Sequence, residues 1–208
     1  MLCDPCLMFV YRTFKSKAKV QKVFFALQVD DFPTLNVLQE AAGLARHDVR
    51  GALNFLQGAG LVWGDGCHGL SDSGHRLLEL LRDTDQPEPS EALCDDCLLE
   101  IGEFLPADGY AVLSQLSSRP TRSRHDLIMS TAITDARLRD VLRILEGARL
   151  IQGGRGRFFR LSETGQRLER LLRRQRRGLH WDSAGSSRGP GVGEPLSLSV
   201  ATGGRGLS

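Results

Sequence analysis

The sequence predicts a mainly helical protein with small β-hairpins, built from two tandem copies of one domain. Three observations lead to this fold class. Long segments repeat at a nearly constant spacing, apolar residues in each copy recur at helical intervals, and a glycine-rich stretch interrupts each copy at the same place. The 208 residues allow one or two domains, and 41% hydrophobic with 25% charged residues is ordinary for a globular protein.

The repeat can be read directly from the letters. Residues 53–62 match residues 142–151 at a spacing of 89, and residues 70–77 match residues 161–168 at a spacing of 91. The difference of two residues falls in the glycine-rich stretch between the matched segments, where a loop tolerates a change of length. We therefore interpret the chain as a duplication of a unit of about 90 residues.

Each copy is expected to contain three helices, a hairpin and a last helix, in this order. For the first copy the helices are expected at 17–27, 34–42, 46–58 and 73–82, with the hairpin around Gly64. For the second copy the first two helices are expected at 110–117 and 126–132, and the third is expected to begin after Thr134. The last helix is expected to begin after an N-cap at Ser162 or Thr164. The strands of the hairpin are expected from Ile151 and over 157–161.

The third helix of the second copy is the best defined of these elements. Thr134 is a suitable N-cap, because its hydroxyl can accept a hydrogen bond from a free backbone N–H. Leu138, Leu142 and Leu145 form one apolar stripe with a period near 3.6. The opposite face of this helix is then expected to carry Ala136, Asp140 and Arg143, flanked by Arg137 and Arg139.

Both copies carry the pattern L-x-x-L-x-x-x-G-L-[VI], a glycine-rich hairpin, and L-[ST]-x-x-G, at 53–62 with 70–74 and at 142–151 with 161–165. In this pattern the chain resembles MarR-type and related prokaryotic winged-helix regulators. The resemblance covers both repeats and implies two tandem winged-helix domains. Arg149 replaces the glycine of the pattern in the second copy, so we expect this turn to differ slightly.

The expected domain boundaries follow from the repeat and from composition. The first winged-helix repeat spans 1–84 and the second 94–177, each with a CxxC pair in its N-terminal segment. Between them, the acidic, proline-containing linker 85–93 should be extended and partly stiff. Glycine, serine and proline dominate residues 178–208, which predicts a disordered tail.

The two copies differ in charge. Residues 1–105 hold 9 Lys and Arg against 16 Asp and Glu, whereas residues 106–177 hold 16 Arg against 7 acidic residues. The basic second copy is therefore the one expected to bind a polyanion, and the acidic first copy is a candidate for contact with a protein partner. The alternative for the second copy is a solvated arginine-rich surface.

The resemblance implies which arginines would contact double-stranded DNA. In a winged helix the third helix enters the major groove, the wing reaches phosphate or the minor groove, and residues before the second helix contact phosphates. In the first copy the equivalent face holds His47, Gly51 and Asn54, of which Asn54 could read adenine. The predicted DNA-binding set in the second copy is Arg122, Arg124, Thr134, Arg137, Arg139, Arg143, Arg155, Arg157 and Arg160.

Cysteine spacing gives the clearest chemical signal. Cys3 and Cys6 recur as Cys94 and Cys97, at a spacing of 91. Two CxxC pairs can complete a tetrahedral zinc site, which would join the repeats, or can hold an iron–sulfur cluster. A redox pair and simple burial of small apolar residues are the alternatives. Cys67 has no counterpart in the second copy and is not expected to be a ligand.

These patterns favour a DNA-binding transcriptional regulator. A winged-helix adaptor between proteins, in a chromosome or transcription assembly, and a thiol- or metal-based redox sensor are the alternatives. We expect no enzyme activity, because the sequence has no nucleophile elbow, phosphate loop or H-E-x-x-H motif. It has no long apolar run and no signal peptide at its start, so we expect a cytoplasmic, nucleoid-associated protein without a membrane contact.

Overall fold

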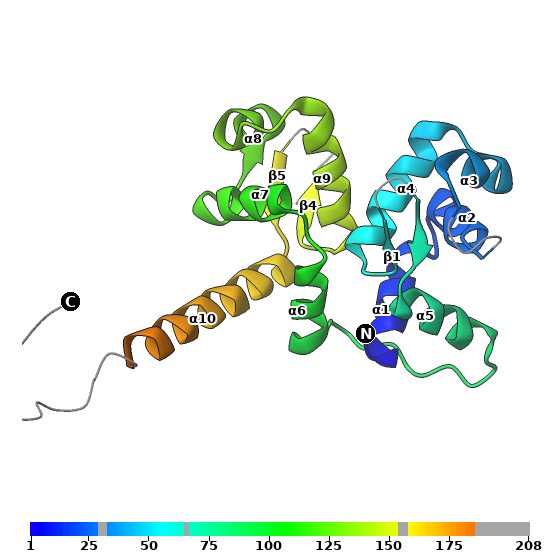
Figure 1. Cartoon of the computed structure of the whole chain (residues 1–208), viewed down its shortest axis with the longest axis horizontal. Helices are drawn as coiled ribbons and strands as arrows, with labels where there is room; N and C mark the ends of the chain where they lie inside the picture. Colours follow the sequence, from blue (N-terminus) through cyan, green and yellow to red (C-terminus); the bar gives the residue numbers. More distant parts are fainter. Residues whose placement is uncertain (29–32, 65–66, 154–157, 186–208) are drawn as a thin grey trace, which may run out of the picture. The chain divides into compact units, whose positions relative to one another are not determined.

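The computed structural model describes residues 1–28, 33–64, 67–153 and 158–185, with side chains as far as residue 175. The chain is mainly helical, with two small antiparallel sheets, as the sequence predicts (Figure 1). Residues 1–174 form one compact unit, whose buried side chains make one continuous hydrophobic core. No helix in the described part of the chain is both long enough and apolar enough to cross a membrane.

Apart from the short strand β3 of the second set, the same order of elements occurs twice along the chain. The first set is α1 (Asp4–Phe14), α2 (Ala18–Ala26), α3 (Leu35–Ala42), α4 (Arg46–Gly58), β1 (Val62–Trp63), β2 (Gly69–Leu70) and α5 (Asp72–Arg82). The second set is α6 (Asp95–Glu103), α7 (Ala107–Ser118), β3 (Arg122–Ser123), α8 (Arg124–Thr131), α9 (Asp135–Gly147), β4 (Ile151–Gly153), β5 (Phe158–Leu161) and α10 (Glu163–Gly185).

Each glycine-rich stretch is flanked by the two strands of an antiparallel hairpin. In the first hairpin Val62 pairs with Leu70, and in the second Ile151 pairs with Leu161. The second sheet gains β3 as an additional edge strand and has the order β3-β5-β4. In the first copy an isolated bridge between Thr34 and Cys67 occupies the corresponding place.

Hydroxyl caps begin α5, α9 and α10. Thr134 accepts a hydrogen bond from the Arg137 backbone N–H, and Ser162 accepts one from the Gly165 N–H at 3.0 Å. Ser71 does the same for Gly74 at 3.1 Å. The serine of the repeated L-S-x-x-G segment is therefore the N-cap in both copies, which resolves the choice between Ser162 and Thr164.

Helices α4 and α9 pack against each other through a reciprocal glycine contact (Figure 1). A Cβ atom on Gly58 would lie 1.8 Å from the Ile144 carbonyl oxygen, and one on Gly147 would lie 2.0 Å from the Phe55 carbonyl oxygen. Gly147 follows Gly58 by the repeat spacing, as Ile144 follows Phe55. The two copies thus use the same surface toward one another, as in a two-fold symmetric dimer.

The turn at Arg149 has the same left-handed conformation as its counterpart in the first copy. Arg149 has φ 57° and Gly60 has φ 72°, so both residues adopt the left-handed conformation. The turn therefore differs only slightly, and arginine adopts a left-handed conformation that usually favours glycine. Its guanidinium lies 5.0 Å from the centre of the Phe9 ring of α1, a favourable cation–π contact between the two copies.

Three helices also differ from the elements expected from the sequence. Helices α1 and α6 were not expected, although Asp4 and Pro5 directly after Cys3 are typical of a first helical turn. Helix α10 continues to Gly185, beyond the expected end at residue 177, and the rest of the predicted disordered tail lies outside the described residues.

Candidate metal centre

The two CxxC pairs occupy the same positions on two helices. Cys3 is the N-cap of α1 and Cys94 is the N-cap of α6. Cys6 and Cys97 lie three residues further on, in the first turn of each helix. Since an N-cap side chain lies beside the third residue of its helix, this spacing brings both thiols of a pair to the helix N-terminus, which favours negative charge.

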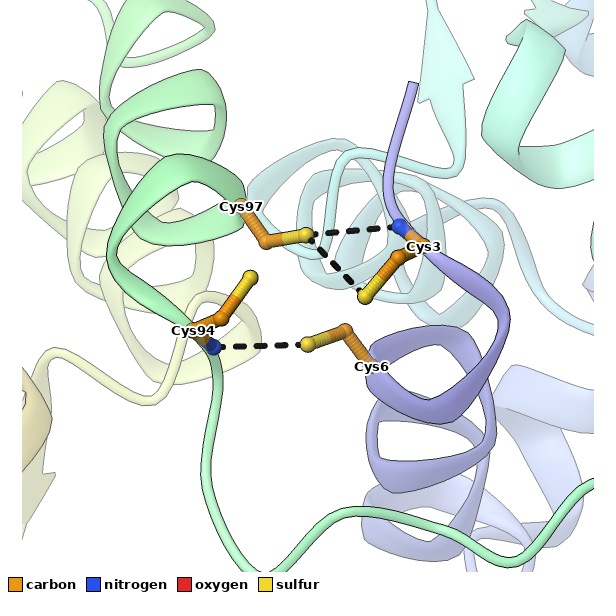
Figure 2. A group of neighbouring side chains, drawn as sticks. All are labelled: Cys3, Cys6, Cys94 and Cys97. Carbon is orange, nitrogen blue, oxygen red and sulfur yellow. Dashed lines mark hydrogen bonds between the residues drawn. The ribbon is translucent and has the colours of Figure 1, made fainter.

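The four sulfur atoms converge on one point. Their Sγ atoms all lie within 4.8 Å of one another, and those of Cys3 and Cys97 are 3.6 Å apart. Figure 2 shows the two side chains from α1 facing the two from α6. All five cysteines are free thiols, and Cys67 is not part of the cluster. The expectation that the two pairs meet is therefore confirmed.

Backbone groups of each helix donate to a sulfur of the other. The Cys3 N–H donates to Cys97 Sγ and the Cys94 N–H donates to Cys6 Sγ, both at 3.3 Å (Figure 2). Such N–H···S bonds stabilise the negative charge on a thiolate sulfur, whether free or bound to a metal. The cluster is therefore reciprocal in its hydrogen bonds as well as in its ligands.

Burial differs within each pair. Cys6 and Cys97 are buried, whereas Cys3 and Cys94 are exposed. Burial raises the pKa of the Cys6 and Cys97 thiols. At Cys94 burial also acts to raise the pKa, but hydrogen bonds from Cys97 and other neighbours outweigh it, and the pKa is lowered. An ion that binds here must displace protons from the buried thiols, which metal coordination by thiolates does.

The donor set fits a tetrahedral zinc ion. Zn²⁺ bound by four thiolates at about 2.3 Å requires sulfur–sulfur distances of about 3.8 Å. Sulfurs that already lie within 4.8 Å reach this arrangement by small side-chain rotations. The four ligands would be Cys3, Cys6, Cys94 and Cys97, and the ion would then join α1 of the first copy to α6 of the second.

An arginine of the last helix of each copy holds the acidic residue that follows the first cysteine. Arg76 of α5 binds Asp4 in a bidentate ion pair, with distances of 2.9 and 2.7 Å. Arg167 of α10 pairs with Asp95 at 2.5 Å and also donates to the Leu93 carbonyl. The hydrogen bonds from Arg76 hold the pKa of Asp4 below its usual range.

These two arginines were missed in the sequence, although the signal was present. Arg167 follows Arg76 and Asp95 follows Asp4 by the same 91 residues that separate the cysteine pairs. Each pair fixes the N-terminus of α1 or α6 to the last helix of its own copy. We infer that they position the cysteines, since an anchored helix start leaves the thiols fewer orientations.

The residues predicted to contact DNA are distributed over α8, α9 and the second sheet. Most of the described ones already have polar partners: Arg122 donates to Gln115 and Ser118, Arg124 and Arg139 pair with Asp135, Arg137 pairs with Asp108, and Arg160 donates to Gln152. Thr134 caps α9. Arg155 and Arg157 lie outside the described residues.

The face of α9 expected to read base edges is partly covered by α4. Asp140 accepts a hydrogen bond from the Asn54 amide at 2.9 Å, and the Arg143 guanidinium lies against Gly51. At the repeat spacing of 89, Asn54 corresponds to Arg143 and Gly51 corresponds to Asp140, so these two contacts are equivalent halves of one symmetric contact. Asn54 and Asp140 are half-buried at this contact, whereas Arg143 stays exposed. The exposed arginines of α9 in its first turns are Arg137 and Arg139.

Comparisons with known proteins do not assign the chain to a family. The chain matches no protein-family model and no curated protein. It is similar to the crystal structure of the DIP2311 protein from Corynebacterium diphtheriae, at 19% identity and a TM-score of 0.27. The match covers 73% of this chain and 27% of that chain. The geometry of the chain itself therefore carries the functional argument.

Proposed function

We propose that this chain is a tandem winged-helix DNA-binding regulator whose two repeats are joined by a zinc ion in a four-cysteine centre. The observation that carries the zinc centre in this proposal is the convergence of four sulfurs, two from each copy, within 4.8 Å. Such a centre crosslinks α1 and α6 and so fixes one arrangement of the repeats. Binding rather than catalysis is the expected activity.

Metal content tests the first part of the proposal. Protein purified without added metal should contain one zinc per chain by mass spectrometry, because a site closed by four thiolates binds zinc tightly. The variant Cys6→Ser/Cys97→Ser should contain none. Cys67→Ser is the matched control and should keep its zinc, since Cys67 lies outside the cluster. A brown protein with iron and sulfide would instead assign an iron–sulfur cluster.

The proposed DNA contact is argued from charge and exposure in the second copy. Residues 106–177 hold 16 Arg against 7 acidic residues, and Arg137 and Arg139 are exposed near the N-terminus of α9. Their partners, Asp108 and Asp135, are themselves partly exposed carboxylates. Exposed ion pairs of this kind contribute little to stability, so a phosphate can replace the carboxylate at small cost.

Salt dependence tests this contact. Affinity for a mixed-sequence DNA duplex should fall steeply with salt, and Arg137→Ala/Arg139→Ala should reduce the slope of log K against log salt by about 2. The control is Arg46→Ala/Arg50→Ala at the start of α4, where Arg50 occupies the position that corresponds to Arg139. An equal loss of DNA affinity in both variants would contradict the assignment of DNA binding to the second copy. A DNA affinity that does not depend on salt would contradict it as well.

A protein adaptor is the second candidate function. The observation that favours it is the contact between α4 and α9, which covers Asp140 and leaves less of the third helices for a DNA groove. An adaptor would show no salt-dependent DNA binding while keeping its metal. The measurements above therefore separate the two functions.

A further inference from the structure

The first copy carries an apolar surface along α2. One hollow of about 670 Å³ lies between α2 and α3, and a second of about 380 Å³ lies beside α1 and α5. Phe25 lines both hollows, and its side chain is 43% exposed. We use the name Phe25 surface for the two hollows, whose apolar walls include Ala18, Ala41, Tyr11, Leu78 and Leu81.

Helix α2 is apolar on two faces, and the core accounts for only one of them. Val20, Val23 and Phe24 are buried in the core. Ala18 and Phe25 lie on the other side of the same helix, where both are exposed. A fold that needed α2 only to cover its core would place polar residues on this second face.

The second copy shows that the fold does not require this apolar surface. At the repeat spacing of 89, Phe25 corresponds to Ser114 and Ala41 corresponds to Ser130. At the spacing of 91, Leu78 corresponds to Glu169. Ala18 and Leu81 recur as Ala107 and Leu172, so the apolar side chains that are particular to the first copy are Phe25, Ala41 and Leu78.

The charged residues that line the Phe25 surface are basic, although the first copy as a whole is acidic. Lys22 lines the first hollow and Arg82 lines the second. Among the described residues that line the two hollows, none is acidic, although residues 1–105 hold 16 acidic residues against 9 basic ones. A partner surface that is apolar at its centre and acidic at its edge is complementary to this arrangement.

We propose that the Phe25 surface binds an acidic amphipathic helix of another protein. Two apolar side chains of the helix, about one or two turns apart, enter the hollows on either side of Phe25. Glutamate or aspartate residues flanking these anchors lie beside Lys22 and Arg82. The surface is distinct from the cysteine cluster and from the arginines of α9, so the inference does not depend on the proposed function.

A synthetic peptide provides the probe. An amphipathic helical peptide with Leu and Phe on one face and Glu on the other should bind the full chain, as measured by fluorescence anisotropy. A matched peptide with Lys in place of Glu should bind at least about tenfold more weakly, because it repels Lys22 and Arg82. Amide chemical shifts in NMR spectra should change along α2, α3 and α5.

Substitutions locate the contact. Phe25→Ser introduces the residue that the second copy has at this position, so the variant should fold, retain its metal and bind DNA as before. It should bind the acidic peptide at least about tenfold more weakly, as expected for an aromatic anchor at the centre of an interface. Lys22→Glu should lower the affinity for the acidic peptide and raise the affinity for the basic peptide. Ser114→Ala in the second copy is the matched control and should leave the affinity for both peptides unchanged.

Three results would overturn the proposal. The first is equal affinity for the acidic and basic peptides, and the second is acidic-peptide binding that Phe25→Ser leaves unchanged. The third is a dimer in sedimentation that Phe25→Ser dissociates, because that result assigns the Phe25 surface to a second copy of this chain.

Discussion

Replacing Gly58 with alanine will destabilise the protein by about 2–3 kcal/mol. The added Cβ would lie 1.8 Å from the carbonyl oxygen of Ile144, a backbone atom that cannot rotate away. Helices α4 and α9 would have to separate, and the close packing between them would be lost. Alanine's higher helix propensity offsets only about 1 kcal/mol of this cost. Denaturant unfolding followed by circular dichroism measures the difference.

Gly51→Ala on the same helix is the control. Its Cβ would lie 3.3 Å from Nε of Arg143, the far end of a flexible side chain that can move aside. This variant should be as stable as the original or slightly more stable, because alanine favours the helix. Gly147→Ala should match Gly58→Ala, since its Cβ would lie 2.0 Å from the Phe55 carbonyl oxygen. Equal stability of all three variants would contradict the close helix contact.

Periodicity explains why the elements could be predicted from the sequence. The apolar stripe of α9 at Leu138, Leu142 and Leu145 is buried, and the predicted bounds of the first copy's third helix agree with α4. These features depend on local spacing alone. The cysteine cluster was predictable for a related reason, since two matched motifs in a duplicated chain meet if the copies pack symmetrically.

The packing of the copies could not be predicted from hydrophobicity. The contact between α4 and α9 brings together polar residues, Asn54 with Asp140, and an arginine beside Gly51. A polar helix face of this composition is equally typical of a solvated or a DNA-binding surface. The recurrence of Gly58 as Gly147 was a readable sign of close approach, but a helix glycine by itself does not name its neighbour.

With the proposed zinc ion bound at the four cysteines, its removal by a chelator will lower the midpoint of thermal unfolding by roughly 10 °C or more. A ligand at about a thousand times its dissociation constant stabilises the folded state by about 4 kcal/mol, and each kcal/mol shifts the midpoint by about 2–4 °C in a domain of this size. Zinc would bind the folded arrangement of the four sulfurs, because only folding brings Cys3 and Cys97, which are 94 residues apart in the sequence, to a sulfur–sulfur distance of 3.6 Å. Calorimetry with and without a strong chelator measures the shift.

The matched cysteine variants show whether the shift arises at the proposed centre. Cys67→Ser should unfold like the original protein and respond to the chelator in the same way. Cys97→Ser should already unfold at the lower temperature, and the chelator should change it no further. Much of the chain should stay folded without metal, because α6 is also held by its buried Leu98 and Ile101 and by the Tyr110 hydroxyl bond to the Gly102 carbonyl. If the chelator leaves the midpoint of the original protein unchanged, the four cysteines do not hold a stabilising metal, and their convergence reflects packing alone.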